Sequence, residues 1–183
     1  MKQLMDYVKV YDVFDAQFCD DVVAQLQDDW MKHGFYLHDE KKRISTDDDL
    51  YVSHQETEHS AYIGKELFKP LRKYIDDVDL PSLQGWDGYL GIRYNKYEVG
   101  QKMHWHADRV QQMFDGERKG IPTLSIVGAL NDDYEGGDFV MLEDEVVAMP
   151  KGSVLIFPST FMYIHTVTPV TKGTRFSYVS WLW

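Results

Sequence analysis

Apolar residues follow two different spacings along this chain, and the change near residue 82 separates a helical part from a strand-rich part. In the first part, apolar side chains recur at every fourth position, at Phe18, Val22, Leu26 and Trp30. Acidic and amide residues occupy the other faces, so residues 16–31 are predicted to form an amphipathic helix. Asp15 is suited to cap the start of this helix, and Gly34 is suited to end it.

Three further segments are predicted in the first part of the chain. Residues 7–14 alternate imperfectly and favour an opening strand. Residues 62–77 carry apolar side chains near helical spacing, with Pro81 beyond their end, and predict a second helix. The polar stretch 38–59 shows no sustained period, so it is interpreted as a loop and as a candidate lid over a pocket.

The second part consists of short apolar runs separated by turn residues. Strand-like runs cover residues 86–94, 97–108, 122–130 and 154–165. Turns are predicted at residues 135–138, 143–145 and 150–153, and the polar stretch 109–120 is expected to be a mobile loop at the mouth of a pocket. Many short strands joined by regular turns favour a sandwich or barrel.

A jelly roll fits this order of elements, because two packed antiparallel sheets can hold ligands from non-adjacent strands around one cavity. The fold class is therefore expected to be mainly β with two flanking N-terminal helices (α+β). One domain is expected over residues 1–183, with a helical support region over 1–81 and a jelly-roll catalytic core over 82–183.

Composition and charge restrict the chemistry and the partners. With 44% hydrophobic residues the chain can bury a sizeable core unaided, so any metal is expected to be functional. The single cysteine, Cys19, cannot form an internal disulfide and indicates a reducing, cytoplasmic location. The N-terminus lacks a signal-like segment, and no apolar run approaches the roughly 18 residues of a membrane span, so a soluble protein is expected. The net charge of −11 argues against nucleic acid as a partner, whereas the oligomeric state is left open.

His106 and Asp108 lie two residues apart in a stretch that favours a strand. On a strand, residues i and i+2 project from one face roughly 6.6 Å apart along the chain, so both side chains can reach one metal ion. His165, near the end of a second strand-like run, is the candidate third ligand. His104 shares the strand face and is its rival, expected near the site but outside the coordination shell. Two histidines and a carboxylate form the facial triad of non-heme Fe(II) oxygenases, although zinc accepts the same ligands.

Arg175 follows His165 by ten residues (175 − 165) and begins an apolar run. Its planar guanidinium can hold a carboxylate through two hydrogen bonds. This arrangement resembles the Fe(II)- and 2-oxoglutarate-dependent oxygenases, in particular the prolyl 4-hydroxylase-like branch with its PKHD-type hydroxylases. Three more segments within residues 86–183 resemble that branch: Tyr97-x-x-Gly100-Gln101, Leu130-Asn131 through Glu135-Gly136-Gly137-Asp138-Phe139, and Pro169-Val170-Thr171-x-Gly173-x-Arg175.

The resemblance implies a double-stranded β-helix and a set of site residues. His106, Asp108 and His165 would bind Fe(II), and Arg175 would bind the distal carboxylate of 2-oxoglutarate. Tyr97 matches a tyrosine that hydrogen-bonds the cosubstrate. Many members also carry a tyrosine directly before the Leu-Asn pair, where this chain has Ala129. That contact is either lost or supplied by Tyr97, Ser125 or Thr174.

The resemblance further implies a dioxygenase that uses Fe(II), 2-oxoglutarate and O2, with ascorbate as a candidate accessory. It would hydroxylate a C–H bond while 2-oxoglutarate is decarboxylated to succinate. A prolyl residue of a peptide or protein is the expected target, and free proline or another amino acid is the nearer alternative. A non-catalytic jelly-roll module that binds a metal or a small acid is the alternative from another class. Enzymes that repair alkylated bases share the metal ligands but carry a different arginine pattern.

Overall fold

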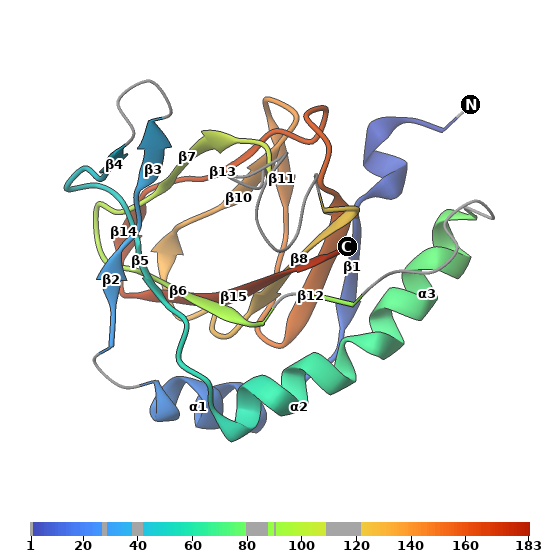
Figure 1. Cartoon of the computed structure of the whole chain (residues 1–183), viewed down its shortest axis with the longest axis horizontal. Helices are drawn as coiled ribbons and strands as arrows, with labels where there is room; N and C mark the ends of the chain where they lie inside the picture. Colours follow the sequence, from blue (N-terminus) through green and yellow to red (C-terminus); the bar gives the residue numbers. More distant parts are fainter. Residues whose placement is uncertain (1, 27–28, 38–41, 80–87, 90, 109–121) are drawn as a thin grey trace.

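Two antiparallel sheets face each other, and helices cover the outer side of the larger one (Figure 1). The computed structural model describes residues 2–26, 29–37, 42–79, 88–89, 91–108 and 122–183. Jelly-roll proteins are built in this way, so the expected mainly β fold with flanking helices is confirmed. Among the described residues, no helix is long and apolar enough to cross a bilayer.

The larger sheet has seven strands. Their order is β1 (Lys9–Asp12), β12 (Ser153–Pro158), β8 (Leu124–Ala129), β15 (Arg175–Leu182), β6 (Arg93–Tyr97), β5 (Tyr51–Ser53) and β2 (Met31–Lys32). The smaller sheet has four strands, in the order β11 (Glu145–Val147), β10 (Phe139–Met141), β13 (His165–Val167) and β7 (Met103–His106). Two separate pairs join β14 (Val170–Lys172) to β9 (Glu135–Gly136) and β3 (Phe35–Leu37) to β4 (Lys42–Ile44).

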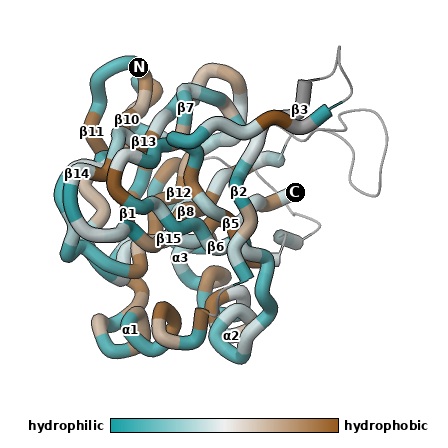
Figure 2. Tube along the Cα trace, turned by 90° about the vertical axis from the view of Figure 1, so that its left-hand side faces the viewer, coloured by the Kyte–Doolittle hydropathy of each residue, from teal (hydrophilic) through white to brown (hydrophobic). Residues whose placement is uncertain are grey.

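The helices are α1 (Ala16–Gln25), α2 (Glu58–Glu66) and α3 (Phe68–Val78), preceded by the short 3-10 helix η1 (Leu4–Tyr7). Seen from the side, α1 and α2 lie beneath the strands (Figure 2). Although residues 1–81 hold these helices, they also supply β1, β2 and β5 to the larger sheet.

Strand β12 explains why the core has two layers. Its side chains alternate, so Val154 and Ile156 pack with the helices while Leu155 and Phe157 pack between the two sheets. A strand that is buried on both faces has a continuous run of apolar residues in its sequence, and β12 has such a run. The layer between the sheets is the one that the candidate metal ligands border.

The first predicted helix begins as expected but is shorter. The Asp15 carboxylate caps α1 by accepting a hydrogen bond of 2.8 Å from the backbone N of Phe18. The prediction that the helix extends to residue 31 and ends at Gly34 is wrong, because α1 ends at Gln25. Met31 instead pairs with Val52 in the larger sheet.

The second predicted helix, over residues 62–77, is two helices that meet at Leu67. Pro70 lies in the first turn of α3 and has no N–H to donate back to Glu66, so the hydrogen-bond ladder is interrupted there. The helical pattern itself was predicted correctly, but its start was placed too late, since α2 begins at Glu58.

The prediction of a loop over residues 38–59 is wrong for part of that stretch, which contains β4, β5 and the start of α2. Strand β5 forms because Val52 pairs with Asn95 of β6, a partner distant in sequence. Residues 38–41 and the predicted loop 109–120 lie outside the described residues.

The strand predictions of the second part are partly confirmed. Residues 122–130 contain β8, but residues 154–165 divide into β12 and the first residue of β13. In the run 86–94, residues 86–87 and 90 are not described, and β6 begins at Arg93. The turns at 143–145 and 150–153 are present. The hairpin turn predicted at 135–138 is wrong, because Glu135 and Gly136 form β9 and pair with β14.

Candidate metal and cosubstrate site

The fold brings together the side chains of His106, Asp108 and His165. His106 ends β7, His165 begins β13, and these two residues are direct partners across the smaller sheet. Asp108 follows two residues after the end of β7. Its Oδ1 lies 3.5 Å from Nε2 of His106 and 3.9 Å from Nε2 of His165. One donor atom from each residue lies within 4.8 Å of the others, which is close enough to share one ion.

Backbone carbonyl groups orient both imidazoles. Nδ1 of His106 lies 2.8 Å from the carbonyl oxygen of His104, and Nδ1 of His165 lies 3.0 Å from that of Tyr163. A carbonyl oxygen can only accept, so each Nδ1 carries a proton, and Nε2 is the ring nitrogen that faces Asp108. This outer hydrogen bond is the usual support of a metal-binding histidine.

Burial sets the protonation states of the cluster. It lowers the pKa of His165 to about 4, because Phe139 and Phe157 surround the ring with apolar surface at centroid distances of 5.2 and 5.0 Å. Burial also raises the pKa of Asp108. Contacts with His106, His165 and Ser125 outweigh this effect, so the net pKa of Asp108 lies well below its usual range. At neutral pH the cluster therefore offers a carboxylate and an unprotonated imidazole at His165.

The two oxygens of the Asp108 carboxylate have different neighbours. Oδ1 faces the imidazoles, whereas Oδ2 accepts a hydrogen bond of 2.5 Å from the Ser125 hydroxyl. The Ser125 hydroxyl also lies 2.7 Å from the hydroxyl of Ser159. Sequence reasoning offered Ser125 as a cosubstrate contact, and its hydroxyl here contacts a metal-ligand candidate. Ser159 carried no sequence signal, because it approaches Ser125 only through the pairing of β8 with β12.

Arg175 places a buried positive charge between the sheets and near aromatic rings. It is 2% exposed, begins β15 and lies opposite Tyr97 of β6. Its guanidinium carbon lies 5.0 Å from the ring centre of Tyr97 and 6.0 Å from that of Tyr134. Nη1 donates to the Ser177 hydroxyl at 3.0 Å, while Nε has no hydrogen-bond partner among the described residues. A buried guanidinium without a carboxylate partner in that part of the chain is suited to bind an anionic ligand.

The Leu-Asn motif holds the segment around Arg175 in place. Nδ2 of Asn131 donates to the carbonyl oxygen of Thr174 at 2.7 Å, and its Oδ1 accepts from the backbone N of Phe176 at 2.7 Å. One side chain therefore bridges both neighbours of the arginine. Thr174 contributes its backbone to this arrangement.

The glycine pair in this region has a packing role. A Cβ atom added at Gly137 would lie 3.0 Å from Cδ of Arg175 and 3.1 Å from Cε2 of Tyr134, and its φ of +65° is one that other residues rarely adopt. Gly137 thus allows the backbone to approach the arginine side chain closely. In the motif Gly136-Gly137 that the sequence singled out, Gly137 therefore makes room for the buried Arg175 side chain.

The comparisons with known proteins agree with this geometry. Residues 92–183 match the family described as the 2OG-Fe(II) oxygenase superfamily. The chain belongs to this superfamily. Within it, a PKHD-type hydroxylase of Paraburkholderia xenovorans is 32% identical over 165 residues, which cover 78% of this chain and 70% of the relative. This 2OG-Fe(II) oxygenase therefore falls in the prolyl 4-hydroxylase-like branch that the sequence motifs indicated.

Other relatives match over less of their length. A PKHD-type hydroxylase of Bordetella pertussis is 30% identical over 95 residues, which span 49% of this oxygenase and 41% of the relative. Among solved structures, the viral collagen prolyl hydroxylase of Paramecium bursaria Chlorella virus-1 has a TM-score of 0.68 at 14% identity, covering 96% of this chain and 95% of the viral one. That similarity shows the shared fold.

Proposed function

We propose that this oxygenase hydroxylates a prolyl residue of a peptide or protein, using Fe(II), 2-oxoglutarate and O2. The observation that carries the proposal is the combination of two features in one fold. The first is a three-residue cluster of metal donors, and the second is the buried Arg175 guanidinium without a carboxylate partner among the described residues. A protein that only binds a metal has no use for the second feature.

The donor set fits Fe(II). Two imidazole nitrogens and one carboxylate oxygen occupy one side of an ion and leave the other side for small ligands, as in non-heme iron oxygenases. His106, Asp108 and His165 would hold the ion. Bound iron, together with 2-oxoglutarate and O2, supplies the oxidising power that inserts an oxygen atom into a C–H bond.

Arg175 fits the distal carboxylate of 2-oxoglutarate. Its fork of N–H groups matches a carboxylate, and burial strengthens the attraction because water does not compete. The Tyr97 ring fixes the guanidinium from one neighbouring strand and Ser177 fixes it from its own strand. Tyr97 is also the candidate for the hydroxyl contact that a tyrosine at position 129 would make in related enzymes.

The relatives support a prolyl target. The matching relatives include PKHD-type hydroxylases, and the structural neighbours include prolyl hydroxylases, one of them in complex with a peptide fragment of hypoxia inducible factor. A peptide is therefore the first substrate class to test, with free proline as the second.

The decisive experiment has two stages. Anaerobic addition of Fe(II) and 2-oxoglutarate should produce a weak visible charge-transfer band, and admission of O2 should yield succinate. A set of proline-containing peptides and free proline should then be analysed by mass spectrometry for an added oxygen atom. A protein that binds the metal but shows neither the band nor succinate is a binding module, and the proposal is then wrong.

A further inference from the structure

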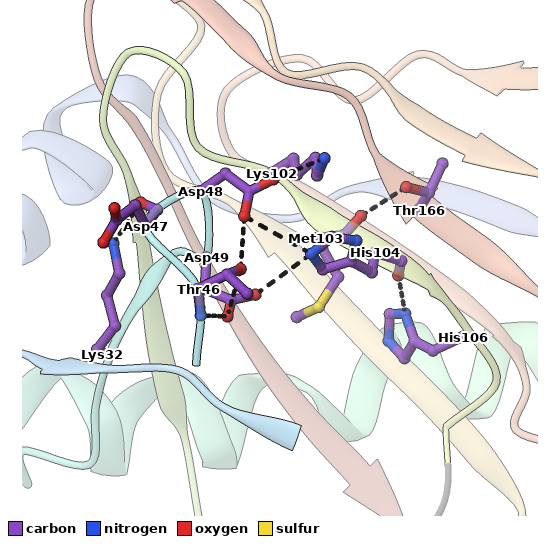
Figure 3. Close-up of polar contacts among 10 residues, drawn as sticks. All are labelled: Lys32, Thr46, Asp47, Asp48, Asp49, Lys102, Met103, His104, His106 and Thr166. Atoms are coloured by element: carbon purple, nitrogen blue, oxygen red, sulfur yellow. Dashed lines mark hydrogen bonds and ion pairs between the residues drawn. The ribbon is translucent and has the colours of Figure 1, made fainter. Parts of the chain in front are cut away.

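A pocket lies beside the candidate metal-ligand cluster, where the segment between β4 and β5 meets β7. It has a volume of about 290 Å³ and is lined by Ile44, Thr46, Asp49, His104 and Trp105. His104 lies two residues before His106 on the same strand. The two positions are therefore separated by roughly 6.6 Å along β7. Figure 3 shows Thr46, Asp49 and His104 converging at this place, with His106 further along the strand.

Three consecutive carboxylates approach this region, but only one of them is buried. Asp48 forms an ion pair of 2.7 Å with Lys102, and the hydrogen bond from Lys102 holds the pKa of Asp48 well below its usual range. Asp47 is exposed. Asp49 is 1% exposed and lines the pocket.

The carboxylate of Asp49 is only half satisfied. Its Oδ2 accepts hydrogen bonds from the backbone N of Thr46 at 2.6 Å and from the Thr46 hydroxyl at 3.1 Å. Among the described residues, Oδ1 has no hydrogen-bond partner. Nε2 of His104 lies 3.7 Å from Oδ1, which is beyond hydrogen-bonding distance. A buried carboxylate oxygen without a donor is costly, so a donor is expected from a ligand.

The other residues that line the pocket restrict the chemistry of the ligand. Ile44 and Trp105 expose apolar surface, with 38% and 49% of their area accessible. Such walls suit the methylene stem of a long side chain, and the indole face attracts a cation. A ligand with an apolar stem and a cationic end would satisfy the walls and Asp49 together.

We infer that this pocket receives the side chain of a lysine or arginine that lies close in sequence to the residue hydroxylated. The inference rests on the proposed function in one respect, since the basic residue belongs to the peptide substrate. An extended peptide advances about 3.3 Å per residue, so the separation along β7 corresponds to a basic residue a few positions from the target. The pocket would thus select among proline-containing peptides.

The test measures peptide binding and does not require turnover. Fluorescent peptides blocked at both ends, each with a single proline among small residues, carry lysine, arginine, norleucine or glutamate at one position near the proline. Binding is followed by anisotropy with the full chain, anaerobically with Fe(II) and 2-oxoglutarate, and again without them. At one or two positions, lysine and arginine should bind about tenfold or more tightly than norleucine, as expected for a charge-assisted hydrogen bond. Glutamate should bind more weakly than norleucine.

Three variants test whether the Asp49 carboxylate causes the preference for lysine and arginine. Asp49→Asn keeps an acceptor for Thr46 and should reduce the lysine preference to less than about twofold. Asp47→Asn makes the same charge change outside the pocket and should retain the preference. Ile44→Lys adds a cation to the pocket lining and should also abolish the preference. It provides an independent test in case Asp49→Asn does not fold.

The inference is wrong if the wild-type protein shows no preference for lysine or arginine. It is also wrong if the preference survives in Asp49→Asn, or if Asp47→Asn loses it to the same extent. A peptide with a free amino terminus that binds more tightly than its acetylated twin, without any gain from lysine, would assign the pocket to a terminal ammonium group and would also overturn it. Failure of the proposed function appears separately, as absence of succinate.

Discussion

At the scale of single residues, the Ser125 hydroxyl restricts the carboxylate of Asp108, the candidate metal ligand. Because Oδ2 of Asp108 is already hydrogen-bonded, Oδ1 is left to act as a single ligand atom beside the two imidazoles. Ser159 in turn restricts the Ser125 hydroxyl. These two serines orient the carboxylate, although neither belongs to the cluster of candidate metal ligands.

Ser125→Ala should weaken metal affinity by about ten- to a hundredfold, since removal of an outer hydrogen bond to a metal ligand has effects of that size. Competition titrations with Co(II) or Mn(II) measure this directly. Ser153→Ala is the matched control, because Ser153 is buried in the neighbouring strand β12 and its hydroxyl has no hydrogen-bond partner among the described residues. Equal affinities of the two variants would show that the Ser125 hydroxyl has no positioning role.

Arg175→Ala should weaken the binding of 2-oxoglutarate by two to three orders of magnitude while leaving metal affinity almost unchanged. Loss of one partner of a buried ion pair costs about 3 to 5 kcal/mol, and about 1.4 kcal/mol corresponds to a factor of ten. Arg175→Lys should recover part of the loss, because lysine keeps the charge but lacks the fork.

Separate titrations of metal and cosubstrate, with the exposed Arg72→Ala as control, measure both affinities. Unchanged 2-oxoglutarate affinity in Arg175→Ala would place the carboxylate contact elsewhere.

The residues that sequence reasoning could find are those whose spacing is set within one segment. The pair His106 and Asp108 and the distance from His165 to Arg175 are of this kind. Ser159 and Tyr134 approach their partners only through the pairing of strands distant in sequence, so no periodicity pointed to them. The buried state of Asp49 was equally hidden, because an Asp-rich stretch is usually solvated.

At the scale of elements, helix α1 was predicted in kind but not in length. Its apolar spacing continues to Trp30, yet the chain leaves the helix after Gln25. Trp30 still packs against the core, with its ring 6.2 Å from that of Phe176. The spacing therefore identified which side chains are buried, whereas tertiary pairing with β5 decided the backbone conformation.

Cys19 on α1 should make the free energy of unfolding depend on pH in the alkaline range. Burial raises the pKa of its thiol to about 11, whereas the unfolded value is near 8.5. The unfolded thiol therefore loses its proton first, so the free energy of unfolding should fall as the pH rises from roughly 8.5 towards 11, by at most about 1.4 kcal/mol per pH unit from this group. Below that range the thiol is neutral in both states and contributes nothing.

Urea unfolding of the wild type and of Cys19→Ala between pH 8 and pH 10.5 isolates the effect, because ionisation of tyrosines is common to both proteins. The wild type should lose more stability across this range. Parallel pH profiles would mean that the folded thiol titrates normally.

At the scale of the whole molecule, the stability of the core should not depend on metal binding at the candidate site. One apolar cluster joins the helices to the larger sheet and a second fills the space between the sheets, and neither requires an ion. His106→Ala and His165→Ala should each abolish iron-dependent succinate formation while leaving the melting temperature within a few degrees of the wild-type value. Circular dichroism of the wild type with and without a chelator tests whether its fold depends on a bound metal. A variant that melts early, or one that retains activity, would contradict the assignment of that ligand.

The direct pairing of His165 with His106 has a consequence for folding. Side chains alternate between faces along a strand, so a slip of one residue between β13 and β7 would turn an imidazole away from Asp108. A molecule whose smaller sheet has paired in the wrong register could still be compact, but it would lack the cluster of candidate metal ligands. The amount of metal bound during refolding should therefore measure how many molecules have paired β13 with β7 in the correct register. The rate of metal binding should follow the rate at which these two strands pair.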